Sequence, residues 1–260
     1  MSEGHAPNRR ANKVADWLEA SALAKGVSTS GIYLQELARN HGVKETDVAL
    51  GLNTIRRRAA LLGERYPFRT AGGGLSPRPN AEESVWTALL WMSSESPIRS
   101  QLDIALASTH LERITACALA SLYGEGTQSL RFGWPSEDGR PREFPAAVRW
   151  LATRMGITIG ASYRPPGRKD GGVDVVAWRP FPDGRSGFPV LLTQCTLERD
   201  FAHKADDIDI RVWSGWLSLD LDPAKALAIP DVVASGEEWN SLASRVIVLD
   251  RLLAATANCP

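Results

Sequence analysis

The chain lacks several features that would assign it to a class at once. No run of about 18 apolar residues is present, so the sequence predicts no membrane-spanning helix. No apolar stretch follows the charges at the start of the chain, and we therefore expect no secretory signal. Net charge is missing as well. Because 30 basic residues balance 30 acidic ones, any nucleic-acid contact must come from a local patch.

Cysteine is scarce, and its spacing is uninformative. Cys117, Cys195 and Cys259 are odd in number and far apart, which fits reduced thiols in a cytoplasmic protein better than a disulfide frame or a zinc site. The glycine-rich phosphate loop, the nucleophile elbow and the dinucleotide-binding glycine motif are also absent. What remains is a globular chain of 260 residues, long enough for one large domain or two modest ones.

Residues 1–130 have the pattern of a helical region. Apolar positions recur at helical spacing across residues 11–64, with breaks at 28–31 and at Gly42 that divide the segment into three helices. Residues 66–74 then suggest a short strand and a glycine turn. This order fits a helical bundle that docks on a partner. It also fits a winged-helix DNA reader with the glycine turn as its wing.

Three successive arginines, Arg56, Arg57 and Arg58, stand out in the third predicted helix. They fit a solvated helix face or a contact with phosphate. Because successive helical positions do not share a face, at most one or two of them can meet the same phosphate track. We expect the others to pair with acids or to cover the core with their stems.

Residues 131–260 alternate helices with strands, which predicts an α/β (α+β) fold with a mixed sheet behind the N-terminal helical region. Two further helices, at residues 85–92 and 104–123, precede this part, and a linker is expected at 130–143. The elements predicted after the linker are a helix at 144–155, strands at 157–163, 173–179 and 189–195, a helix at 198–210, and strands near 225–229 and 245–249.

Two of these strands carry polar side chains within apolar runs. Asp174 follows a turn containing Gly171 and Gly172, and Gln194 and Thr196 lie two residues apart in the next strand. The spacing points Gln194 and Thr196 to one face of the sheet and Cys195, between them, to the other.

This strand–turn–strand pattern resembles the metal-binding hairpin of the PD-(D/E)xK, or restriction-endonuclease-like, nucleases, over roughly residues 140–250. The family carries an acid-x-Lys or Gln-x-Lys triplet where this chain has Gln194-Cys195-Thr196. The resemblance implies a Mg²⁺ (or Mn²⁺) site formed by Asp174, Gln194 and the carbonyl group of Cys195. In the family a further acid comes from the helix before the first strand, for which Glu143 is the first choice here and Glu112 the second.

The position of the catalytic lysine departs from the family's pattern, because Thr196 occupies it. In some members of the family the lysine has moved to the following helix. In this chain Lys204 would take that role, with Lys169 as a weaker substitute. Asp170, beside Lys169, is expected to cap the turn rather than to bind metal.

The resemblance therefore implies a metal-dependent DNA endonuclease, acting on DNA rather than RNA, as the effector of a bacterial restriction or anti-phage defence system. Such domains often work beside a partner protein, and a homo-oligomer is compatible with the sequence. Two alternatives remain open. Thr196 can instead mark a catalytically inactive nuclease fold that binds nucleic acid or a protein. The N-terminal region can also belong to a winged-helix regulator whose α/β part dimerises or senses a signal.

Overall fold

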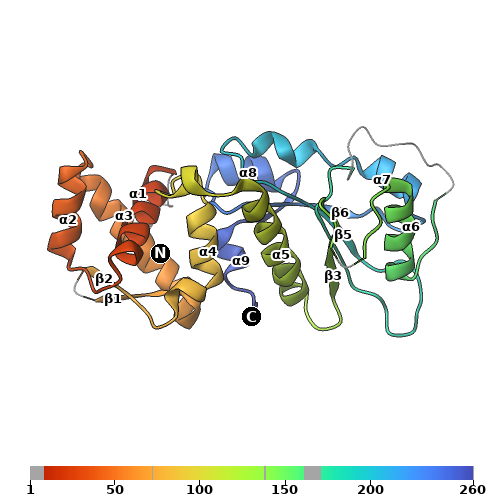
Figure 1. Cartoon of the computed structure of the whole chain (residues 1–260), viewed down its shortest axis with the longest axis horizontal. Coiled ribbons are helices and arrows are strands. Elements are labelled where there is room, and N and C mark those ends of the chain that lie inside the picture. The colour runs from red at the N-terminus through yellow and green to blue at the C-terminus, as the bar shows by residue number, and fades with distance from the viewer. Residues whose placement is uncertain (1–8, 72, 138, 161–170, 260) are drawn as a thin grey trace. The chain divides into compact units, whose positions relative to one another are not determined.

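The computed structural model describes residues 9–71, 73–137, 139–160 and 171–259, and the chain forms two compact units (Figure 1). Unit 1 comprises the chain up to Asp103 together with residues 230–241 and 250–256, whereas unit 2 comprises the remainder. The sequence placed a single boundary near residue 130. Unit 2 instead begins at Ile104, and the chain returns twice to unit 1 near its C-terminus. Among the described helices, none has the length and apolarity needed to cross a bilayer.

Unit 1 is helical, with one small hairpin. Its elements are α1 (Arg9–Lys25), α2 (Gly31–Asn40), α3 (Glu45–Leu62), η1 (Gly63–Arg65), β1 (Phe68–Ala71), β2 (Gly74–Pro77), η2 (Ala81–Glu83), α4 (Val85–Met92), η3 (Arg99–Gln101), most of α8 (Glu237–Ala243) and α9 (Arg251–Ala254). The three predicted N-terminal helices and the glycine turn are confirmed.

Local signals explain these boundaries. The Ser30 hydroxyl caps α2 by accepting a hydrogen bond from the Tyr33 amide. Gly42 adopts a φ of 71° in the connection between α2 and α3. Gly74 begins β2 where a Cβ atom would lie 2.2 Å from the Thr29 carbonyl oxygen, so only glycine fits. Thr29 itself pairs with β2 through an antiparallel bridge.

A buried charge network joins the first part of unit 1 to its last. Asp16 and Glu19 of α1 both accept hydrogen bonds from Arg58 of α3, each over 2.7 Å. Arg251 of α9 also binds the Asp16 carboxylate. All four side chains are buried. Burial by itself raises the pKa of Asp16, but the charges of Arg251 and Arg58 outweigh it and hold that pKa below its usual value.

Two aromatic residues complete this network. The Tyr66 hydroxyl donates to Glu19 over 2.6 Å, and the indole N–H of Trp86 donates to the other Glu19 oxygen over 2.9 Å. The guanidinium groups of Arg58 and Arg251 both lie over the Trp86 ring, 5.1 and 4.7 Å from its centroid. The two acids are therefore surrounded by donors and cations, which offsets the cost of removing them from water.

The arginine triplet separates as expected. Arg58 turns inward to the acids, while Arg56 and Arg57 are exposed on α3. The prediction that members of the triplet pair with acids is confirmed for Arg58.

Unit 2 is a mixed sheet between helices. Its elements are α5 (Ile104–Leu122), β3 (Gln128–Arg131), α6 (Phe144–Met155), β4 (Val175–Trp178), β5 (Val190–Cys195), η4 (Ala202–Asp206), α7 (Ile210–Trp216), β6 (Ala224–Ala228) and β7 (Ile247–Leu249). The strand order is β3-β4-β5-β6-β7. β3, β4 and β5 pair antiparallel, whereas β6 and β7 add to β5 in parallel. The fold is mixed α/β, as predicted.

Helices cover both faces of this sheet. α5 lies on one face and α6 and α7 on the other (Figure 1). On the second face, Val176 and Leu192 pack with Trp213 and Trp216 in one apolar cluster. Alternation along β4 and β5 thus buries both faces of the central strands, which explains why they read as continuous apolar runs.

Two predicted elements were wrong. Within the described part of residues 157–163, only an isolated bridge between Ile159 and Leu217 forms, and residues 161–170 lie outside the described part. The first strand is β3, which begins just before the segment taken as a linker and gains its stability by pairing with β4. The helix expected at 198–210 is replaced by the short η4 and by α7, because the Asp209 carboxylate caps a new helix start.

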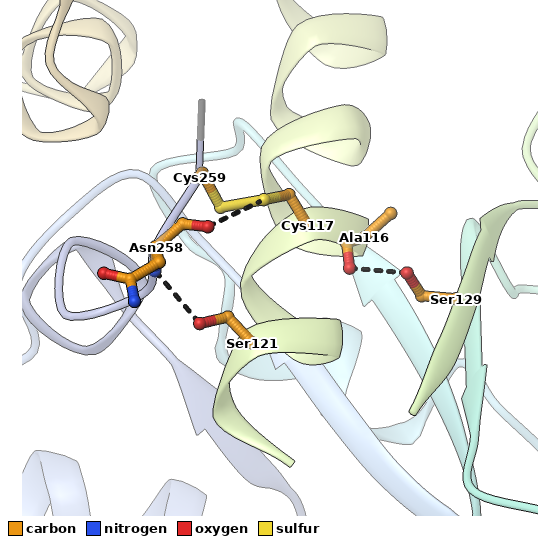
Figure 2. The surroundings of a disulfide bond; sticks show 6 residues. All are labelled: Ala116, Cys117, Ser121, Ser129, Asn258 and Cys259. Carbon is orange, nitrogen blue, oxygen red and sulfur yellow. Dashed lines mark hydrogen bonds between the residues drawn. A yellow bond between two sulfur atoms is a disulfide. The ribbon is translucent and has the colours of Figure 1, made fainter. Parts of the chain in front are cut away.

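A disulfide bond joins Cys117 of α5 to Cys259 (Figure 2). The expectation that all three cysteines are reduced is therefore wrong, and Cys195 is the free cysteine among the described residues. The amide of Asn258 also donates to the Ser121 hydroxyl over 3.0 Å, so a hydrogen bond supports the same junction (Figure 2). A separation of 142 residues conceals this pairing from any local spacing rule.

Arg251→Met should unfold the protein far more easily than Arg56→Met, although both remove a guanidinium group. The first change leaves Asp16 buried with one cation fewer and should lower the free energy of unfolding by about 3 kcal/mol or more. Arg56 is exposed, so its loss should cost less than about 0.5 kcal/mol. Urea denaturation followed by tryptophan fluorescence measures both values. Equal stabilities for the two variants would contradict the importance of the buried charge network.

Removing the disulfide bond with Cys117→Ser and Cys259→Ser should lower the free energy of unfolding, by at most about 5 kcal/mol for a loop of this length. The loss arises because the cross-link limits the freedom of the unfolded chain. Denaturation with and without reductant tests this, with Cys195→Ser as the control that should respond to reductant as the wild type does. An oxidised protein that titrates with three thiols would refute the pairing.

Candidate functional site

Asp174 lies immediately before β4, between two neighbouring strands. Its amide donates to the Thr193 carbonyl over 2.9 Å. Its own carbonyl group accepts from the amides of Phe132 and Gly133, over 2.6 and 2.9 Å. Because backbone bonds hold it on both sides, the position of its side chain is well defined.

The Asp174 carboxylate meets the end of β5. Its Oδ2 atom accepts a hydrogen bond from the Cys195 amide over 2.7 Å and another from the Gln194 side-chain amide over 3.0 Å. The register of the hairpin pairs Val175 with Thr193 and Trp178 with Val190. The prediction that these strands pair and bring Asp174 and Gln194 together is confirmed.

Gln194 satisfies only one end of its amide group. The Nε2 atom donates to Asp174 and, over 3.4 Å, to the Cys195 carbonyl oxygen. The Oε1 atom is buried and has no hydrogen-bond partner among the described residues. An unsatisfied buried oxygen costs roughly 1–3 kcal/mol, so it marks a place where a ligand would be favourable.

Gly172 forms one wall beside this oxygen. It adopts a φ of 79°, and a Cβ atom there would lie 2.7 Å from the Asp207 carbonyl oxygen and 3.7 Å from Gln194 Oε1. Both the backbone angle and the close approach require glycine at this position. The glycine turn seen in the sequence therefore brings the Asp207 backbone against Asp174's strand and next to Gln194.

Cys195 turns to the opposite side of the sheet. Burial raises the pKa of its thiol well above the usual value, and the Asp174 charge raises it further. A thiol with a raised pKa is a poor nucleophile, so the geometry gives no support to thiol chemistry here. Its predicted role concerned only the carbonyl group, which stays at the site beside the Gln194 amide.

The helix that precedes the first strand is α5, because β3 starts the sheet. The acid on that helix is Glu112, the second choice from the sequence. It is buried and forms an ion pair with Arg131 of β3. Glu143, the first choice, is exposed at the start of α6, a helix that lies in the chain between β3 and β4. The sequence ranking assumed that the first strand is at 157–163, so that the helix before it carries Glu143. In the structure the first strand of the sheet is β3, and the helix before it carries Glu112.

Thr196, where the resemblance leads us to expect a lysine, has a structural role. Its hydroxyl group is buried and accepts a hydrogen bond from the Glu198 amide over 3.1 Å, which holds the turn after β5. Lys204 lies in η4, where its ammonium group is 2.9 Å from Glu198 and 3.6 Å from Asp207. The Asp207 backbone packs against Gly172, which lies next to Gln194. The ion pair with Asp207 therefore holds the Lys204 ammonium group on the segment that borders the site.

The remaining predicted residues, Lys169 and Asp170, lie outside the described residues. Within residues 9–71, 73–137, 139–160 and 171–259, no three His, Cys, Asp or Glu side chains gather as a metal site. The candidate site is therefore one carboxylate, one amide and one backbone carbonyl group, from Asp174, Gln194 and Cys195. Comparison with protein-family models, with curated proteins and with solved structures finds no match to this chain.

Sequence reasoning missed the ion pair between Arg131 and Glu112, because the strand that carries Arg131 was taken as a linker. Arg131 is buried and also donates to the Pro135 carbonyl oxygen over 2.6 Å. A buried arginine next to a helix acid has no local sequence signal. Only the pairing of β3 with β4 reveals it.

Proposed function

We propose that unit 2 is a metal-dependent nuclease that hydrolyses phosphodiester bonds of DNA, with Asp174 and Gln194 holding Mg²⁺ or Mn²⁺. The observation that supports this most is the meeting of the Asp174 carboxylate with the Gln194 amide, whose oxygen is buried and unsatisfied. The proposal also retains the biological setting that the resemblance implies, an effector of a bacterial restriction or anti-phage defence system.

The residues fit a hard divalent cation. Mg²⁺ and Mn²⁺ prefer oxygen ligands, and the site offers a carboxylate, an amide and a main-chain carbonyl group. Gln194 now turns its NH₂ group to Asp174, so a half-turn of the amide would place its oxygen beside the carboxylate. Two oxygens side by side repel each other without a cation and are favourable with one. When bound, the metal would supply charge stabilisation at the phosphate and lower the pKa of a water molecule.

The chain's own groups would then position the reactants. The Cys195 amide keeps the Asp174 carboxylate in place by donating to it. Lys204 is the cation proposed to stabilise the phosphate, and Asp207 holds it near the glycine turn. Lys204 also forms an ion pair with Glu198, whose side chain is half exposed. Water can therefore replace the Lys204–Glu198 contact when Lys204 moves.

A second candidate, a catalytically inactive nuclease fold, is favoured by one specific observation. Thr196 fixes a turn instead of presenting a cation, and Glu112 is already neutralised by Arg131. Such a domain would bind nucleic acid or a partner protein without cutting. The two candidates differ in whether any metal-dependent cleavage depends on Asp174.

Asp174→Asn should abolish DNA cleavage while the fold persists. The substitution removes the charge that holds the metal but keeps an acceptor for the Cys195 amide, so stability should change little. Nicking of supercoiled plasmid in Mg²⁺ or Mn²⁺ measures the activity, with EDTA as the blank. Asp183→Asn, the same change in an exposed loop, is the matched control and should cut as the wild type does. No cleavage by the wild type would favour the inactive fold, and cleavage that survives Asp174→Asn would overturn the assignment of the metal site to Asp174.

Lys204→Ala should reduce the rate of cleavage roughly 10²-fold, by analogy with the loss of one preorganised charge that stabilises the transition state. Lys13→Ala is the control, because that lysine lies in unit 1 and is paired with Glu95. Single-turnover rates on the same plasmid compare the two. If both variants cut at the wild-type rate, the lysine has not moved to position 204.

A further inference from the structure

Of the three successive arginines of α3, Arg58 is buried, whereas Arg56 and Arg57 are exposed. The two exposed arginines are part of a larger exposed surface of unit 1. α2 and α3 are joined by only four residues, 41–44, which include Gly42. The hairpin of β1 and β2 follows directly, and Thr29, just before α2, pairs with β2. A pair of helices with a short glycine-containing turn presents its second helix as a ridge.

The two sides of α3 differ in composition. Its inward side carries Val48, Ile55 and Leu62, which join the apolar core of unit 1. Its outward side is lined with exposed residues at helical spacing, two of them large and apolar: Thr46, Ala49, Leu50, Asn53, Arg56, Arg57, Ala60 and Leu61. Thr46, Asn53 and the two arginines can hydrogen-bond with base edges or phosphates, and the two leucines can make apolar contact with a thymine methyl group. The major groove of duplex DNA, about 12 Å wide, admits one α-helix.

Cations flank this ridge although the whole chain has no net charge. Arg39 ends α2, Lys44 precedes α3, and Arg69 lies on β1, all exposed. With Arg56 and Arg57 they outnumber the exposed acids on the same elements, which are Glu36, Glu45 and Glu64. Glu64 is itself paired with Arg78 over 2.6 Å. The local surplus is therefore positive, as a phosphate backbone requires.

A pocket of about 150 Å³ lies between α3 and the hairpin. Leu52, Ile55 and Arg56 line one side, and Thr70, Ala71, Gly73 and Gly74 line the other. Arg56 is the charged residue among those that line it, and the pocket lies beside the helix that would enter the groove.

We propose that unit 1 binds duplex DNA, with α3 in the major groove and with Arg56, Arg57 and Arg69 contacting the phosphates on either side of it. This surface belongs to unit 1 and makes no use of Asp174 or Gln194. It goes beyond the proposed nuclease activity and stands whether or not unit 2 cuts.

The test uses the full chain, because a fragment of residues 1–130 lacks Arg251 and leaves the buried charge network incomplete. Anisotropy of a fluorescein-labelled 25-base-pair duplex of mixed sequence is measured in EDTA, which removes any metal-dependent cleavage, across a salt series. The wild type should bind at low salt and lose affinity as salt rises, with a slope of about −0.9 per phosphate contacted.

The double variant Arg56→Gln/Arg57→Gln should bind more weakly and flatten that slope by about two units. Lys13→Gln is the matched control, because Lys13 also lies in unit 1 but is on α1 and pairs with Glu95. It should bind as the wild type does. Thermal unfolding of each variant verifies that the exposed changes leave the fold intact.

Absence of binding by the wild type at low salt would overturn the proposal and leave the ridge as a surface for a protein partner. An unchanged slope in the double variant, or an equal loss in Lys13→Gln, would also overturn it, by placing DNA elsewhere on the chain. Asp174→Asn should bind like the wild type. A variant that binds but does not cut therefore separates failure of this inference from failure of the nuclease proposal.

Discussion

The arginine side chain at position 251 ties the end of the chain to its beginning. Asp16 and Glu19 are buried on α1, and charges removed from water are stable only when cations and donors surround them. Arg58 supplies one cation from α3, and Arg251 supplies the other from a helix that follows the whole of unit 2 in sequence. Asp231 strengthens the same return by accepting from the amide and the hydroxyl of Ser94. The buried charge network of unit 1 is thus complete only with the C-terminal segments 230–241 and 250–256. The two units are therefore interleaved along the chain and are not joined by one linker.

Unit 2 depends on a different constraint, the polar residues placed where β4 begins and β5 ends. The Asp174 backbone bridges β3 and β5, and its carboxylate reaches across to Gln194 and the Cys195 amide. The site contains less negative charge than a cluster of several carboxylates would. This arrangement suits a cation that is held weakly and completed by substrate oxygens, which is compatible with Mg²⁺ or Mn²⁺ chemistry on a phosphodiester. The same low charge is compatible with the inactive alternative, and Thr196 holds the turn after β5 through its hydroxyl group.

If both proposals hold, the two units would divide the work on DNA. Unit 1 would supply affinity through an exposed ridge, and unit 2 would supply the chemistry through a strand-end site. The division accords with the charge of the chain, because a neutral total leaves binding to a local surplus of arginine and lysine. It also accords with the small size of the site, which offers too few groups to recognise a base sequence by itself.

Local patterns in the sequence determined much of this protein. Helical spacing predicted α1 to α6 apart from their exact ends, and alternation with apolar runs predicted β4 to β7. The glycine turn and the paired strands also determined that Asp174 and Gln194 would meet, because a hairpin register is a local property. Tertiary structure alone decided the rest. β3 is too short and polar to be recognised without its partner β4, so the acid on the preceding helix was taken as Glu143 rather than Glu112. The pairings of Arg251 with Asp16 and of Cys117 with Cys259 join residues more than a hundred positions apart, and no spacing rule reaches that far. Such contacts arise only when packing brings distant segments together, and burial then makes their charges and thiols interact strongly.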